Sequence, residues 1–224
     1  MKLSKIALTA LALAGVATSV TAMSSTFDAG NEGWQVVGMP DSGPYHATTS
    51  GPIPATYEPS QGVPAGSISL IDIDGNTTFF SAPGTYLGNQ LSTYGTSISF
   101  DLMILYNNGW VSADVALTDG VNSLAIDAGP EPVIGPWTHY SVNLNDLAGW
   151  KVGNINGALA TEADIKNVLS DLQGLYIRGE YAWGDDYSYL DNVRMGQVPE
   201  GGSSLALLGG AFALLGAASR KFRK

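Results

Sequence analysis

The sequence contains no cysteine among its 224 residues. This absence excludes disulfide bonds, thiolate metal sites and cysteine nucleophiles. The middle of the chain, residues 23–197, is long enough to bury a core without covalent cross-links. The lack of cysteine is therefore compatible with an exported protein.

Basic residues are scarce in the middle of the chain. Of the ten lysines and arginines, only four lie between Met23 and Val198, against 19 acidic residues, which gives this part a formal charge of −15. A domain this acidic lacks the basic surface that binding to nucleic acid or anionic lipid requires. Its carboxylates could hold divalent cations, although a solvated surface that maintains solubility is the simpler explanation for most of them.

The motifs of several enzyme classes are also absent. The sequence has no Gly-x-Ser-x-Gly elbow, no His-x-x-x-His pair and no glycine-rich phosphate loop with lysine. The two histidines are His46 and His139, and His139 lies within a strand pattern. A Ser-His-Asp arrangement stays open on residue types alone. The sequence favours a non-catalytic module over an enzyme.

The first 22 residues have the pattern of a secretory signal. A short basic start, Met1–Lys5, precedes an apolar run from Ile6 to Val16 that is too short to span a bilayer. Small residues at Val20-Thr21-Ala22 then suit a signal peptidase. We expect a signal helix in residues 1–22 and cleavage before Met23. A permanently attached anchor would need a longer apolar run.

The last 27 residues combine three features. The motif Val198-Pro199-Glu200 is followed by an uncharged stretch from Gly201 to Ala218 and by a basic cluster at residues 220–224. This order resembles the PEP-CTERM sorting signal, with Gly201 where a second proline is usual. The resemblance implies transient anchoring in the inner membrane by an apolar helix, recognition by an exosortase-like protease and removal of residues 198–224. A plain tail anchor is the alternative, and both place the domain outside the inner membrane.

Strand patterns dominate the middle of the chain. Ser97–Leu105 and Val111–Leu117 alternate apolar and polar residues, and Asn107-Asn108-Gly109 between them predicts an antiparallel hairpin. Met39–Pro64 is rich in proline and glycine and is predicted to be a loop. The other predicted strands are Ser25–Asp28, Gln35–Gly38, Ser67–Asp72, Thr78–Ser81, Leu124–Ala128, Trp137–Leu144, Gly174–Gly179 and Tyr187–Met195. Short strands of this kind indicate a β-sandwich or barrel.

One helix is predicted after Thr161. This residue suits an N-cap, acidic residues occupy the first turn, and Ile165, Val168 and Leu169 follow helical spacing up to Gly174. We expect a structural helix that covers an edge of the sandwich.

The stretch Thr78–Asn89 and its continuation Tyr94–Leu102 contain an aromatic pair, Ala-Pro, Tyr-Leu-Gly and Tyr-Gly before an alternating strand. Together with Gly33-Trp34 and Leu190–Val193, they resemble the laminin B (laminin IV) domain. The resemblance implies an all-β jelly-roll sandwich over residues 23–197, akin to galactose-binding and carbohydrate-binding modules. It also implies an attachment or matrix role without a defined catalytic mechanism.

The same resemblance implies a structural calcium site. Jelly rolls of this kind often hold Ca²⁺ between the first and last strands, and the matching residues here are Asp28, Asn31 or Glu32, and Asp191. Carboxylate and carbonyl oxygens are the ligands that Ca²⁺ prefers. Alternatively, Asp28 and Asp191 bond backbone amides.

A saccharide site would need aromatic faces beside polar groups. Exopolysaccharide is the expected ligand, and the predicted glycan-binding residues are Trp110, Glu180, Tyr181, Trp183, Asp185 and Asp186. Further aromatic candidates near loops or strand ends are Tyr45, Trp137, Trp150, Tyr187 and Tyr189. Two alternatives stay open: a purely structural envelope protein with protein partners, and a glycoside hydrolase or lyase that pairs Glu180 with Asp185 or Asp186.

Overall fold

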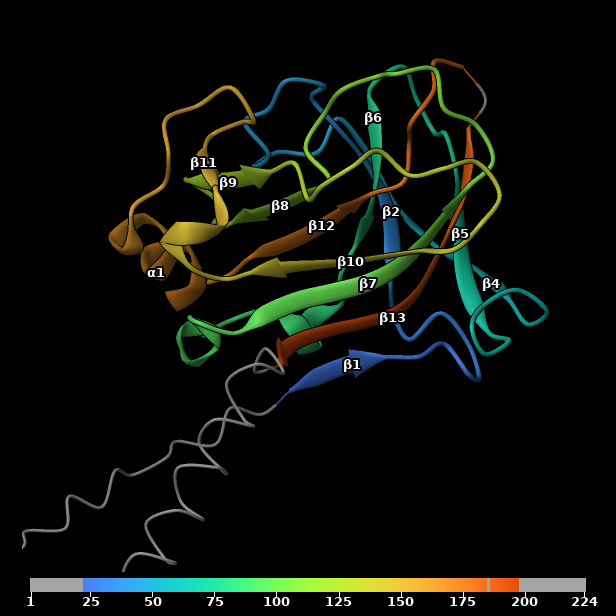
Figure 1. Cartoon of the computed structure of the whole chain (residues 1–224), viewed down its shortest axis with the longest axis horizontal. Coiled ribbons are helices and arrows are strands. Elements are labelled where there is room, and N and C mark those ends of the chain that lie inside the picture. Colours follow the sequence, from blue (N-terminus) through green and yellow to red (C-terminus); the bar gives the residue numbers. More distant parts are fainter. Residues whose placement is uncertain (1–21, 185, 198–224) are drawn as a thin grey trace, which may run out of the picture.

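A computed structural model describes residues 22–184 and 186–197, and it shows two antiparallel sheets packed face to face (Figure 1). Sheet A contains, in order, β10 (Thr138–Asn143), β7 (Ser97–Ile104), β13 (Tyr187–Gln197), β5 (Ser67–Ile71) and β4 (Thr56–Glu58), with β1 (Met23–Ser25) also paired to β13. Sheet B contains β11 (Lys151–Val152), β9 (Ser123–Ile126), β8 (Val115–Thr118), β12 (Gly174–Arg178), β6 (Thr77–Ser81), β2 (Gln35–Met39) and β3 (Ser50–Pro54). The predicted β-sandwich is confirmed. The predicted signal helix and C-terminal apolar helix lie outside the described residues.

The core fills the space between the two sheets. Strand β7 shows how the alternation is used, because Ile98, Phe100 and Leu102 are buried there while Ser99 and Asp101 face outward. The pairing of β1 with β13 brings the two ends of the domain together. Trp34 is fully buried beside them, and its indole Nε1 donates to Ser25 Oγ at 3.0 Å. This bond satisfies the only polar atom that the Trp34 ring buries.

The predicted hairpin between residues 97–105 and 111–117 is wrong. Strand β7 pairs with β10 and β13 in sheet A, whereas β8 pairs with β9 and β12 in sheet B. The chain between them crosses from one sheet to the other, and β8 begins only at Val115. Val111 is 60% exposed in this crossover, although its position in the alternating pattern predicted burial. Alternation identifies the two faces of a strand, but it does not identify the neighbouring strand.

Two strands lie in the segment that was predicted to be a loop. Strand β3 contains Gly51, Pro52 and Pro54, and β4 follows it directly. Each is the last strand of its sheet, β3 in sheet B and β4 in sheet A. Proline lacks the N–H group that a central strand needs, so it is tolerated at such edges. The same prolines made the sequence of this segment look like a loop, so the two strands were not predicted.

The predicted helix is confirmed as α1 (Glu162–Ser170), which lies beside β9 and β11 at one end of the molecule (Figure 1). Thr161 forms a capping box with Asp164, and Ile165, Val168 and Leu169 are buried against the core. Three short 3₁₀ helices complete the fold: η1 (Gly84–Tyr86), η2 (Leu91–Thr93) and η3 (Asp146–Ala148). None of the helices in the described ranges is long and apolar enough to cross a membrane.

Candidate functional site

The structure brings two predicted glycan-binding tryptophans together. Trp183, in the loop after β12, is 69% exposed, and its ring meets that of Trp110 edge to face with centroids 4.1 Å apart. Trp110 is half-buried in the crossover between β7 and β8, and its Nε1 donates to Thr77 Oγ1 at 3.3 Å. Trp110 follows the turn of the predicted hairpin, which does not form, and it lies in the crossover instead. The pair is nevertheless open to solvent on the Trp183 side.

The polar members of the predicted glycan set are buried instead. Glu180 accepts the amide of Thr78 at 2.7 Å. Asp186 accepts the amides of Tyr181 and Ala182 with one oxygen and that of Tyr187 with the other. Tyr181 is 1% exposed. These three side chains hold the loop between β12 and β13 and do not present groups to a sugar, and Asp185 lies outside the described residues. The paired-carboxylate arrangement of a glycosidase is therefore not exposed at Glu180 and Asp186.

Burial changes the acidity of this region. Desolvation raises the pKa of Glu180 to about 7, in spite of the amide bond from Thr78. It raises the pKa of Asp114 to about 6, opposed by the amide of Ala128 and by the nearby Arg178 guanidinium. Arg178 is fully buried over the Tyr181 ring, 4.1 Å from its centroid. These groups form an internal polar cluster that joins the loops at one end of the sandwich.

The predicted calcium ligands lie near the paired terminal strands, but each already has a protein partner. Asp191 on β13 has no exposed surface and accepts the amides of Val63 at 2.7 Å and Asn192 at 2.6 Å. Desolvation raises its pKa, and the carboxylates of Asp101 and Asp28 add to the effect. The backbone-bonding alternative holds for Asp191.

The other predicted calcium ligands are close to the first strand. Glu32 accepts the amides of Phe27 at 2.7 Å and Thr26 at 3.2 Å. The amide of Asn31 donates to Ala55 O, and Asp28 accepts the Thr26 hydroxyl. Within residues 22–184 and 186–197, no group of three or more acidic or histidine side chains is placed to hold a metal ion. Calcium binding stays a prediction.

The outer face of sheet A carries a second aromatic group. Tyr187 and Tyr189 project from β13 with their ring centroids 5.2 Å apart, and the ring centroid of Trp137, the residue before β10, lies 6.4 Å from that of Tyr189. All three are half-buried. We call them the aromatic platform. Of the other aromatic candidates, Tyr45 and Trp150 are buried in the core.

A polar hollow of about 320 Å³ adjoins this platform on sheet A. Asp101 lies at its centre, where it contacts His139 Nδ1 at 2.7 Å and accepts the Asn192 amide at 2.9 Å. The hollow is lined by Val63, Pro64, Ser99, Asp101, His139, Asn192 and Arg194. The sequence did not predict this hollow, because its residues come from four separate segments. The sequence did place Trp137 and His139 two residues apart in a predicted strand, which indicates that they share one face.

Asn192 faces the hollow because β13 is irregular there. The pairing register with β7 shifts between Asp191 and Arg194, and Asn192 adopts a left-handed conformation with φ of 51°. A bulge of this kind redirects a side chain. It allows the Asn192 amide to donate both to Asp101 and to the backbone oxygen of Val63.

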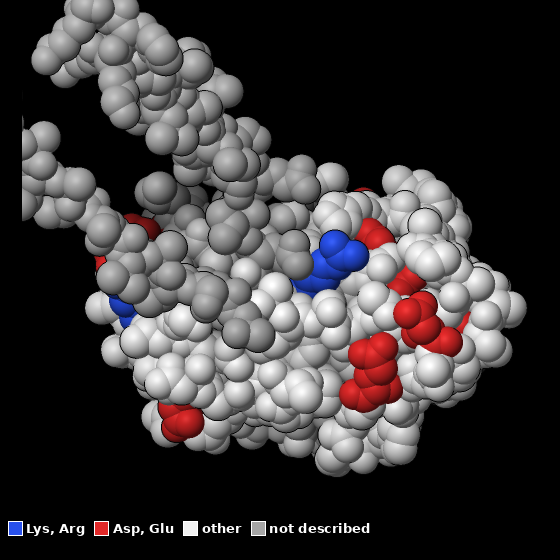
Figure 2. Space-filling model, turned by 90° about the horizontal axis from the view of Figure 1, so that it is seen from below, with Lys and Arg blue, Asp and Glu red and all other residues white. Residues whose placement is uncertain are grey.

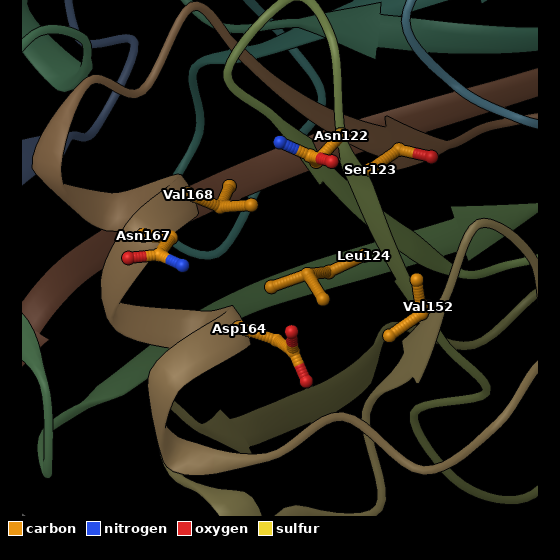
Figure 3. Close-up of a pocket in the computed structure, with 7 residues that line it drawn as sticks. All are labelled: Asn122, Ser123, Leu124, Val152, Asp164, Asn167 and Val168. Carbon is orange, nitrogen blue, oxygen red and sulfur yellow. The ribbon is translucent and has the colours of Figure 1, made fainter.

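A smaller cavity of about 80 Å³ lies between α1 and the edge of sheet B (Figure 3). Its polar side chains include Asp164, whose carboxylate already accepts the Thr161 amide and hydroxyl. Leu124 and Val152 project into the same space in Figure 3. The cavity is too small for a typical ligand pocket, which occupies about 300–1,000 Å³.

The sequence model of the laminin B (domain IV) family matches residues 79–206, more than half of the chain. The chain belongs to the laminin B family. Laminin subunit gamma-1 of Danio rerio is 28% identical over 181 residues, which cover 79% of this chain and 10% of that protein. Laminin-like protein lam-2 of Caenorhabditis elegans is 26% identical over 137 residues, 58% of this chain and 8% of that protein. The chain spans about a tenth of the length of these relatives.

The solved structure of one laminin domain agrees with this fold. The L4b domain of human laminin alpha-2 is similar with a TM-score of 0.58 and 14% identity, covering 79% of this chain and 97% of that domain. A family 11 carbohydrate-binding module of a Clostridium thermocellum cellulase has a TM-score of 0.48 and 10% identity, covering 80% of this chain and 95% of that module. At this identity, the likeness to the L4b domain establishes the fold alone.

Proposed function

We propose that this laminin B domain is a non-catalytic adhesion module of the cell envelope, outer surface or extracellular matrix, and that it binds exopolysaccharide. The observation that carries the proposal is membership of the laminin B family, whose matched relatives here are laminin chains. Exposed and half-buried aromatic rings on the described surface support the glycan part, since aromatic faces stack on sugar rings.

The test is retention of the full chain, purified in a mild detergent, during electrophoresis through gels that contain one polysaccharide each. The panel consists of hydroxyethylcellulose, galactomannan, xylan and alginate. Slower migration in at least one gel, relative to a gel without polysaccharide, is the expected result. Unchanged migration in every gel would contradict glycan binding and would favour the structural alternative with protein partners. Exposed apolar side chains in the loops, among them Val111, Val133 and Ile134, give that alternative a surface.

Export and sorting are part of the same proposal. We propose that residues 1–22 are removed as a signal peptide and that an exosortase-like protease recognises Val198-Pro199-Glu200 after transient membrane anchoring by the apolar segment. Mass spectrometry of the exported protein is expected to find Met23 at the N-terminus and no residues of the basic cluster at 220–224. Replacement of Pro199 and Glu200 by alanine is expected to leave the C-terminal segment attached. A C-terminus at Lys224 in the unaltered exported protein would contradict sorting by cleavage.

A further inference from the structure

The aromatic platform and the polar hollow form one continuous surface. On β7, β10 and β13, residues that face the same side follow one another about 7 Å apart. His139 lies opposite Asp101 and Asp101 opposite Asp191, while Tyr189 lies opposite Met103 one step further along. Trp137 precedes His139 by two residues and therefore faces the same side of sheet A. The three platform rings thus lie directly beside the hollow on the outer face of this sheet.

This surface is held rigidly. The Tyr187 hydroxyl lies 2.8 Å from Glu58 Oε1 and 3.0 Å from Ser69 Oγ, and Ser69 itself donates to Glu58 at 2.9 Å. These bonds anchor one end of the platform to β4 and β5. Because Tyr187 and Tyr189 stand on β13 and Trp137 directly precedes β10, these rings lose little conformational freedom when a ligand binds.

Polar groups suited to hydroxyls surround the rings. The His139 side chain is 63% exposed and is oriented by the carboxylate of Asp101. The exposed Arg194 on β13 supplies N–H donors across β7 from His139, whereas both side-chain N–H groups of Asn192 already bond Asp101 and Val63. Apolar rings beside a few placed donors and acceptors are typical of sugar sites. The volume of about 320 Å³ falls within the usual range for ligand pockets, about 300–1,000 Å³.

The charge of the domain selects among polysaccharides. Asp101, Glu58 and Asp191 lie on this face, with Arg194 as the exposed cation of the hollow. Acidic side chains also outnumber basic ones on the face seen in Figure 2. An anionic chain such as a polyuronate would be repelled by this field. A neutral chain of hexopyranose units is not repelled by these charges.

From this geometry, we propose that the outer face of sheet A is the glycan-binding surface, where the rings of Trp137 and Tyr189 stack on a neutral hexopyranose polysaccharide and the hollow around Asp101 and His139 binds its hydroxyl groups. The inference rests on the proposed glycan binding and assigns it to sheet A rather than to the exposed tryptophan pair Trp183 and Trp110. The glycan-binding surface is then already formed by side chains on or directly beside the strands of sheet A.

The experiment compares single variants of the full chain in the same gels. Trp137→Ala and Tyr189→Ala are expected to weaken retention by a neutral polysaccharide at least about tenfold in apparent Kd, equivalent to about 1.4 kcal/mol. His139→Ala is expected to weaken retention less, because it removes hydrogen bonds and leaves the rings. Trp183→Ala is the matched control, since it removes an equally large and more exposed ring from the loops. Alginate is expected not to retain the unaltered chain.

Thermal unfolding of each variant separates loss of binding from loss of folding. Tyr189→Phe serves as a second variant, because it keeps the ring and is expected to keep most of the retention. If Trp183→Ala abolishes retention while folded Trp137→Ala and Tyr189→Ala keep it, sheet A is not the site, and glycan binding itself survives. If alginate retains the chain and neutral polysaccharides do not, the charge argument fails. If no gel retains the unaltered chain, the proposed function fails together with this inference.

Discussion

At the residue scale, Arg178 connects two segments that are far apart in sequence. Its guanidinium donates to the backbone oxygens of Glu180, at 2.6 Å, and of Trp110, and it lies 3.8 Å from Asp114. Asp114 also accepts the Tyr181 hydroxyl at 2.9 Å. A buried cation of this kind is tolerated because several acceptors surround it. It ties the crossover after β7 to β12.

Replacement of Arg178 by methionine is expected to lower the free energy of unfolding by about 3–5 kcal/mol, since it breaks a buried charge pair from one side. The measurement is urea unfolding of the full chain at neutral pH. Arg194→Met is the matched control, and because Arg194 is exposed its expected effect is within about 0.5 kcal/mol. Equal effects of the two substitutions would contradict a structural role for Arg178.

The buried carboxyl of Glu180 makes a pH-dependent contribution to stability. Its pKa in the folded protein is about 7, above the ordinary value of 4.5. Between about pH 4.5 and pH 7 the folded protein therefore binds more protons than the unfolded chain, and the free energy of unfolding falls as the pH rises. Asp114, whose pKa is raised to about 6, acts in the same direction.

Glu180→Gln is expected to make that decline shallower and to stabilise the protein at pH 8, because glutamine still accepts the Thr78 amide and has no charge to bury. The measurement is a series of urea unfolding curves from pH 4 to pH 8. If the free energy of unfolding depends on pH equally in Glu180→Gln and in the unaltered chain, the pKa of Glu180 is not raised by burial.

At the scale of single elements, helix α1 was predictable because its signals are local. Thr161, its acidic first turn and its apolar face lie within a dozen residues, and the capping box forms between residues three positions apart. Strands β3 and β4 were not predictable in the same way. Their edge positions depend on strands elsewhere in the chain, and their prolines remove the usual pattern.

Thr161→Ala is expected to destabilise the protein by about 1 kcal/mol, within the range of 0.5–2 kcal/mol for the loss of an N-cap. The Asp164 amide then loses its side-chain acceptor. Thermal or urea unfolding measures the loss, and Thr161→Ser, which keeps the hydroxyl, is expected to retain most of the stability. A serine variant as unstable as the alanine variant would contradict the capping role.

At the scale of the whole molecule, the two ends of the domain meet where β1 pairs with β13. The laminin B resemblance put the predicted calcium ligands at the first and last strands, and the pairing brings these strands together, although the described residues contain no group of three or more acidic or histidine side chains placed to hold a metal ion. Asp191 and Glu32 instead bond backbone amides that would otherwise be left without acceptors.

Calcium binding at this end predicts a higher unfolding temperature in Ca²⁺ than in excess chelator, because an ion that binds only the folded state stabilises it by mass action. The shift is expected to disappear in Asp28→Ala. This variant is preferable to Asp191→Ala, which would leave two backbone amides without acceptors in any case. Asp127→Asn, in the loop after β9, is expected to keep the shift. An unfolding temperature of the unaltered chain that is the same in Ca²⁺ and in chelator would contradict calcium binding.

The predicted glycan cluster shows why a site is harder to predict than a strand. Glu180 and Asp186 sit among aromatic residues in a loop, a composition that suits a sugar site equally well whether the carboxylates face solvent or backbone amides. Glu180 turns inward because β6 pairs with β12 and presents the Thr78 amide, while Asp186 bonds the amides of its own loop. Trp183 does stay exposed, as a binding role requires.

The sequence by itself determined the class of fold, the position of the helix, the acidic character of the domain and the stretch Thr78–Asn89 that resembles the laminin B family. These properties depend on composition or on neighbours within a few residues. The tertiary structure decided that β7 pairs with β10 and β13 rather than with β8, and that Trp137 and Tyr189 share one face with Asp101. Such contacts join residues many positions apart. Whether they form depends on how two complete sheets pack, and no local pattern encodes that choice.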